Sequence, residues 1–197
     1  RFAAWKDPES RLLGFENIEL LSKKTVSYWL SEIPKIREEF SDRILIASIM
    51  AGMDPQEWQS LAVQVATAGV HAIELNFSCP HGMPERGVGA AIGQDAGITG
   101  RIAGWVRGAT RLPVIVKLTP NVTDVRPIAL AAIEAGANAL AAINTVQCLA
   151  GVDLETLSPC PPVNGQSAFG GYSGAAIKPI GLRVVAQAAA ATKAPIH

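Results

Sequence analysis

Short apolar runs alternate with helical patterns along this chain, and this alternation constrains its fold more than any other feature. Strands are expected at Ile44–Ile49, Val70–Phe77, Val114–Leu118, Asn138–Ile143 and 194–197. These runs are largely apolar throughout, which is typical of parallel strands whose two faces are both covered. Strands of this kind, joined by helices, predict an α/β fold.

The segments between the strands carry helix signals. Asp54 is placed to cap a helix, Pro55 suits its first turn, and Gly69 suits its end. A helix is also expected before the first strand, with Pro34 inside it. Further helices are expected around Ile98–Ala109, from a Thr123 cap to Gly136, and at Ile177–Ala191, after a long loop.

Two α/β architectures fit this order: an open doubly wound sheet and a (β/α)₈ TIM barrel. An open sheet usually carries G-x-G-x-x-G directly after a strand, whereas Gly87–Gly93 has another spacing and lies well past a strand end. Polar residues instead follow successive strands, at Asn76, Lys117 and Asn144, and barrel enzymes build their sites from those strand ends. A barrel is therefore favoured.

A complete barrel takes about 250 residues, and this sequence has 197. We therefore expect one partial barrel domain, residues 1–197, that holds roughly the middle βα units and is incomplete at both ends.

Composition excludes several classes of function. Seventeen basic and 17 acidic residues give no net charge, so nucleic-acid binding is not expected. No apolar run reaches the roughly 18 residues of a membrane span. Three cysteines without paired spacing, and no signal peptide, predict a cytoplasmic protein without a disulfide framework. No metal-ligand pattern, C-x-x-C or nicotinamide-binding fingerprint occurs.

The strongest chemical signal lies in Glu74–Gly87. Cys79 follows a strand and precedes a proline and a glycine-rich loop. A thiol, with a reference pKa of about 8.5, is mostly protonated at neutral pH and can donate a proton. A structural cysteine that packs as a small apolar residue explains the position equally well from the residues alone. Cys148 and Cys160 carry no predicted role.

Residues 76–82 resemble the active-site loop of dihydropyrimidine dehydrogenases, within the dihydroorotate dehydrogenase superfamily. The similarity continues in the same order through 17–21, 116–124, 143–145 and 170–174. The resemblance implies an FMN-binding barrel that reduces the 5,6 double bond of uracil or thymine. Flavin N5 would deliver hydride to C6, and Cys79 would protonate C5.

The same resemblance implies the binding residues. Lys117 would contact the flavin N1/O2 region, where a cation stabilises the negative charge of the reduced flavin. The other flavin contacts implied are the backbone groups of Gly171, Ser173 and Gly174. The substrate-binding positions implied are Asn17, Glu19, Asn76, Ser78, Asn144 and Thr145. An asparagine amide offers both donors and an acceptor to a neutral imide, although a single asparagine after a strand is also explained by a turn.

Two alternative functions remain, and Glu19 bears on one of them. Beside the carboxylate of orotate, Glu19 would add a repulsion on the order of 4 kcal/mol, whereas an N–H of uracil can donate to it. Dihydroorotate dehydrogenase is therefore the first alternative. A barrel-derived structural or assembly subunit without flavin is the second. The resemblance also implies that NAD(P)H, FAD and iron–sulfur clusters lie on a partner subunit or a missing domain, in an oligomer.

Overall fold

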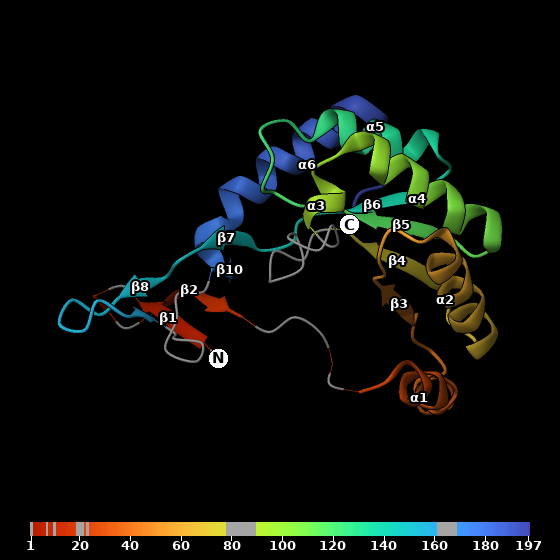
Figure 1. Cartoon of the computed structure of the whole chain (residues 1–197), viewed down its shortest axis with the longest axis horizontal. Helices are drawn as coiled ribbons and strands as arrows, with labels where there is room; N and C mark the ends of the chain where they lie inside the picture. Colours follow the sequence, from red (N-terminus) through yellow and green to blue (C-terminus); the bar gives the residue numbers. More distant parts are fainter. Residues whose placement is uncertain are drawn as a thin grey trace.

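The computed structural model of the chain describes residues 2–6, 8–9, 11–18, 22, 24–77, 90–160 and 169–197. Its centre is a parallel sheet in the order β3-β4-β5-β6 (Figure 1). The strand bounds are β3 (Ile46–Ile49), β4 (Ala72–Asn76), β5 (Val114–Lys117) and β6 (Ala139–Ala141). The last residues continue this order, because Ile196 forms a parallel bridge with Leu140 of β6. The predicted α/β class and the predicted parallel pairing of the strands are confirmed.

Helices cover the outer face of this sheet. The bounds are α2 (Pro55–Ala68), α3 (Ala90–Gly93), α4 (Ala96–Ala109), α5 (Arg126–Glu134) and α6 (Lys178–Thr192). A further helix, α1 (Val26–Glu39), lies beside edge strand β3 (Figure 1). The sheet is not closed into a barrel by the described residues.

Alternation along the strands separates the outer face of the sheet from its inner face. Ile73, Leu75 and Val116 are fully buried and belong to the main core with helix residues such as Ile102. Their neighbours point the other way, since successive strand side chains alternate between faces. The polar residues Glu74, Asn76 and Lys117 therefore lie on the inner face.

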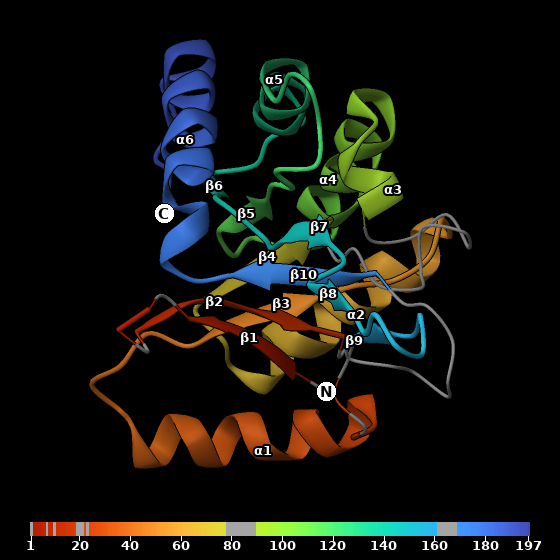
Figure 2. The same ribbon diagram turned by 90° about the vertical axis from the view of Figure 1, so that its left-hand side faces the viewer.

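A second, antiparallel sheet lies beyond the carboxyl ends of the parallel strands (Figure 2). Its order is β1-β2-β10-β7, and β8 pairs with β9 beside it. The bounds are β1 (Phe2–Lys6), β2 (Leu12–Asn17), β7 (Val146–Cys148), β8 (Gly151–Val152), β9 (Pro159–Cys160) and β10 (Gly170–Ser173), with the 3-10 helix η2 (Ala175–Ile177) before α6. The long loop expected before the last helix is therefore wrong in part. The strands found there are short, and β8 and β10 contain glycine, which is rare in strands.

The helix ends mostly follow the predicted signals. Asp54 Oδ1 accepts the Gln56 N–H at 2.9 Å, and Gly69 ends α2 with φ of 101°. The predicted Thr123 cap is wrong. Asp124 Oδ1 instead accepts the Arg126 N–H at 3.0 Å, where α5 begins. A carboxylate one residue further along is the better acceptor for that first turn.

Gly93 makes a close backbone contact with the end of β4. A Cβ atom at position 93 would overlap the carbonyl oxygen of Phe77. We expect Gly93→Ala to lower the free energy of unfolding by about 1–3 kcal/mol, the usual cost of overpacking. Gly104→Ala is the matched control, since nothing lies within 4 Å of the added Cβ; it should stabilise by about 0.5–1 kcal/mol. Urea denaturation measures both, and equal effects would contradict the contact.

Among the described residues, no helix is long and apolar enough to cross a membrane.

Candidate active site

Asn76 and Lys117 end two neighbouring strands at the carboxyl edge of the parallel sheet. They are register partners, the last residues of β4 and β5. Both are half-buried and lie on the inner face. This pairing places an amide beside a cation, as the sequence predicted for strand ends.

Asn144 reaches the same edge from the segment after β6. Its Nδ2 donates to Asn76 Oδ1 at 3.3 Å, and its Oδ1 accepts the Thr145 N–H at 2.8 Å. The Asn144 N–H also donates to the Leu118 carbonyl at 3.2 Å. Three of the predicted site residues, Asn76, Asn144 and Thr145, are therefore joined by hydrogen bonds.

Asn121 holds this arrangement together, and sequence reasoning missed it. Its Nδ2 donates to the Thr145 carbonyl at 3.2 Å, while its Oδ1 accepts the Gln147 N–H at 2.9 Å. The fully buried Thr119 accepts from Asn121 Nδ2 at 3.1 Å. Its place in the Thr-Pro-Asn sequence after β5 was the available signal.

The antiparallel sheet brings in Asn17. Gly171 of β10 pairs with Asn17 of β2 on one side and with Gln147 of β7 on the other. Residues directly opposite in a sheet point to the same face, so these three form one row. Because Asn121 binds both Gln147 and Thr145, the row is linked to the carboxyl edge of the parallel sheet.

Two predicted flavin contacts lie at the end of β10 and directly after it. Ser173 pairs with Phe15 of β2. Gly174 has φ of 107°, and a Cβ there would lie 2.7 Å from Gly14 Cα. Close packing against β2 is therefore sufficient reason for glycine at this position. Flavin contacts by Gly171, Ser173 and Gly174 stay predictions.

Lys117 has a charged neighbour that sequence reasoning did not assign. Its Nζ lies 3.9 Å from Glu74 Oε1, and that oxygen accepts the Ser48 hydroxyl at 2.7 Å. The three residues come from β5, β4 and β3. The Glu74 carboxylate, two residues before the end of β4, therefore partly balances the positive charge of Lys117.

The buried Glu16 lies beside the half-buried Cys148. Glu16 is fully buried and its Oε2 accepts the Ala150 N–H at 3.0 Å. Burial, and then the nearby Glu16 carboxylate, raise the pKa of the Cys148 thiol to about 11. This thiol stays protonated at neutral pH and is a poor nucleophile. Glu16 points to the opposite face of β2 from Asn17, since the two are adjacent on one strand.

Cys79, Ser78 and Glu19 lie outside the described residues, so their predicted roles stay predictions. Phe77, two residues before Cys79, is buried at the carboxyl end of β4, where its ring packs edge-on against Trp58. Within the described part of the chain, no group of three His, Cys, Asp or Glu side chains could hold a metal ion.

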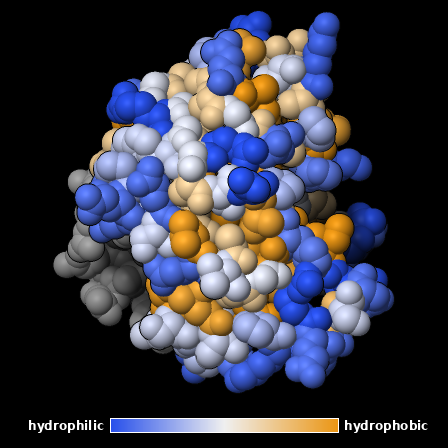
Figure 3. All heavy atoms as spheres, turned by 90° about the vertical axis from the view of Figure 1, so that its right-hand side faces the viewer, coloured by the Kyte–Doolittle hydropathy of each residue, from blue (hydrophilic) through white to orange (hydrophobic). Residues whose placement is uncertain are grey.

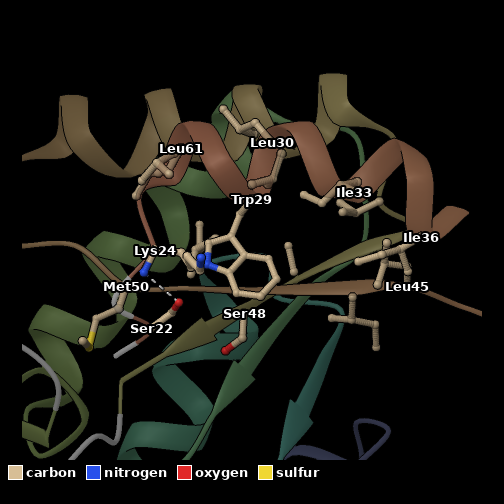
Figure 4. A pocket seen from close by; sticks show the side chains of 16 residues that line it. Ser22, Lys24, Trp29, Leu30, Ile33, Ile36, Leu45, Ser48, Met50 and Leu61 are labelled. Carbon is tan, nitrogen blue, oxygen red and sulfur yellow. Dashed lines mark hydrogen bonds between the residues drawn. The ribbon is translucent and has the colours of Figure 1, made fainter. Parts of the chain in front are cut away.

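A separate apolar hollow of about 500 Å³ lies between α1 and β3. Trp29 and Ile33 of α1 point into it (Figure 4). Apolar atoms are exposed on this side of the molecule (Figure 3), where Val26, Trp29 and Ile46 are exposed. Its lining is mostly apolar, with Ser22, Lys24 and Ser48 as the polar residues, and includes none of the described polar residues at the carboxyl edge of the sheet.

Residues 14–197 match the family model described as dihydroorotate dehydrogenase. The chain belongs to the dihydroorotate dehydrogenase family. Its fold class is therefore that of a TIM barrel, of which the described residues form consecutive parallel βα units. The polar carboxyl edge lies where barrel enzymes of any kind place their active sites.

Several relatives within and around this family are similar over most of the chain. Dihydropyrimidine dehydrogenase (NADP(+)) from Arabidopsis thaliana is 44% identical over 88% of the chain and 41% of the relative. The NAD-dependent dihydropyrimidine dehydrogenase subunit PreA of Escherichia coli K12 is 38% identical over 95% and 45%. The dihydroorotate dehydrogenase B (NAD(+)) catalytic subunit of Methanocaldococcus jannaschii is 41% identical over 87% and 54%.

The chain spans about half the length of these curated relatives. Among solved structures, the carboxyl transferase domain of Rhizobium etli pyruvate carboxylase with oxalate is 20% identical, with a TM-score of 0.45. The match covers 59% of this chain and 19% of the pyruvate carboxylase chain. That likeness is too low to bear on the function of this family member.

Proposed function

We propose that this chain is a partial barrel domain of an FMN-dependent oxidoreductase that reduces the 5,6 double bond of uracil or thymine. The observation that carries the proposal is the meeting of Asn76, Asn144 and Lys117 at one edge of the parallel sheet. Two amides and one cation at a barrel mouth suit a neutral, hydrogen-bonding ring next to a cofactor that becomes anionic.

The residues present fit FMN. The Lys117 side chain lies on the inner face and is 31% exposed, and its ammonium would hold the flavin N1/O2 region. Backbone groups of Gly171, Ser173 and Gly174 would supply further contacts. When bound, FMN supplies the hydride, from its N5 to C6 of the pyrimidine.

The amide side chains would orient the substrate. Uracil and thymine present alternating N–H donors and carbonyl acceptors, and an amide can pair with such an edge through two hydrogen bonds. Asn144 Nδ2 donates to Asn76 Oδ1 at 3.3 Å, and a bound ring would replace that hydrogen bond with its own contacts to the two amides. Asn17, Thr145, Ser78 and Glu19 complete the proposed substrate contacts.

Cys79 would supply the proton. Its Sγ–H bond breaks as the proton moves to C5, on the side of the ring opposite the flavin, and solvent then reprotonates the thiolate. Cys79 follows Phe77 by two residues, a separation that an extended chain covers in about 7 Å. Phe77 directly follows the strand that ends with Asn76, and we propose that Cys79 acts at the same edge.

Partners belong to this proposal as well. The Escherichia coli relative is named as a subunit of an NAD-dependent enzyme, and the Methanocaldococcus jannaschii relative as a catalytic subunit. Both names favour an electron-donating partner for this chain in an oligomer. We propose that FAD, iron–sulfur clusters and the NAD(P)H site lie on that partner or on a further domain, and that the enzyme is cytoplasmic.

Flavin content and substrate choice test the proposal. We expect the full-length protein to bind FMN, and uracil or thymine, but not dihydroorotate, to be turned over with its electron-donating partner. The readouts are flavin absorbance and product formation for the three substrates. Turnover of dihydroorotate alone would favour the dihydroorotate dehydrogenase activity named for the archaeal relative. A protein that binds no flavin would favour a structural or assembly subunit.

A further inference from the structure

Glu74 lies on the inner face of the parallel sheet, one row below the edge that carries Lys117. Its Oε1 accepts a hydrogen bond from Ser48 Oγ at 2.7 Å, and Lys117 Nζ lies 3.9 Å from the same oxygen. Ser48 and Glu74 are register partners on β3 and β4. The carboxylate is thus fixed by the neighbouring strand, on the side of Lys117 away from the carboxyl edge.

The two charges are partly shielded from water. The side chain of Glu74 is 19% exposed and that of Lys117 is 31% exposed. Solvent and salt weaken the interaction of such a pair less than that of charges on an open surface. Asn76, the register partner of Lys117, is uncharged, so Glu74 is the anion that bears on this ammonium among the described residues.

We propose that Glu74 is a positioning residue for Lys117. The Glu74 carboxylate limits how far the Lys117 ammonium reaches toward the flavin and offsets part of the positive charge of that ammonium. This inference rests on the proposed flavin site. Negative charge collects at the N1/O2 region of a reduced flavin, and a cation beside it favours reduction. Glu74 therefore keeps the flavin reduction potential below the value that Lys117 alone would set.

Glu74→Gln tests the proposal, because glutamine keeps the shape of the side chain and an oxygen for Ser48. We expect the reduced flavin to gain affinity relative to the oxidised flavin on the order of tenfold, a rise of about 30 mV in the two-electron midpoint potential. Equilibration of the FMN-loaded full-length protein with a reference dye measures it. Glu38→Gln, an exposed change of equal charge on α1, should leave the potential unchanged.

Two further variants show whether Glu74 acts through Lys117. Lys117→Met should lower the midpoint potential of the flavin. In the Lys117→Met background, Glu74→Gln should change the affinity for reduced relative to oxidised flavin by less than about threefold, because the effects of coupled residues are not additive. Ser48→Ala, which releases the carboxylate, should raise the potential by a smaller amount than Glu74→Gln and tests the same point if the glutamine variant does not fold.

An unchanged or lowered potential in the Glu74→Gln and Ser48→Ala proteins, with FMN bound, would overturn this inference but not the proposed function. Failure of the wild-type protein to bind FMN would overturn the proposed function and this inference with it. A purely structural role for Glu74 would reduce folded protein or FMN content without raising the potential.

Discussion

Replacing Cys79 with alanine is expected to lower steady-state reduction of uracil by about 10²- to 10⁴-fold, the usual effect of removing a general acid. The loss should fall on the proton transfer to C5, because the amides of Asn76 and Asn144 and the ammonium of Lys117 are untouched. FMN content and the affinity for uracil should therefore stay near those of the wild-type protein. Steady-state kinetics and the flavin spectrum measure the two effects separately.

Cys160→Ala is the matched control for that experiment. Cys160 is exposed on the short strand β9, so its loss should leave the rate unchanged. Wild-type rates in the Cys79→Ala protein would show that another group donates the proton. A loss of FMN together with activity would instead indicate that position 79 matters for folding of the site.

Trp58→Ala is expected to lower the free energy of unfolding by about 3–5 kcal/mol, as large aromatic truncations in cores do. Trp58 is fully buried on α2, packs edge-on against Phe77 with ring centroids 5.5 Å apart, and donates from Nε1 to the Gly52 carbonyl at 2.6 Å. The truncation leaves a cavity under the end of β4. Denaturant unfolding of the purified protein measures the cost.

Trp58→Phe gives the graded comparison. It keeps most of the apolar volume and removes the hydrogen bond to Gly52, so it should cost about 1–2 kcal/mol. If the alanine variant lost less than about 1 kcal/mol, the packing of α2 against β4 would have to differ from the arrangement seen here.

The parallel part of the fold could be predicted because its signals are local. Continuous apolar runs mark buried strands, and Asp54 and Gly69 mark the ends of α2. The pairing of Asn76 with Lys117 follows from the same logic, since parallel strands end at one edge. The Thr123 cap failed because α5 begins only at Arg126, and the Asp124 carboxylate is the side chain that accepts the first helical N–H.

The antiparallel sheet and the supporting polar residues could not be predicted in the same way. Strand β10 contains two glycines and owes its structure to partners far away in the sequence, Phe15–Asn17 and Val146–Cys148. Asn121 and Glu74 act through side-chain contacts, with Thr145 and Lys117 respectively, that strand order alone does not specify. The role of Cys79 remains a prediction that the proposed variants test.

The pairing of β2 with β10 also sets an order in which the protein can be made. Strand β2 lies near the beginning of this sequence and β10 near its end, with the βα units between them. Contacts between neighbouring βα units form early on a growing chain, whereas a pairing of this sequence separation waits until both strands have been synthesised. We therefore expect the strand row of Asn17, Gly171 and Gln147 to form only after the βα units between β2 and β10 have folded.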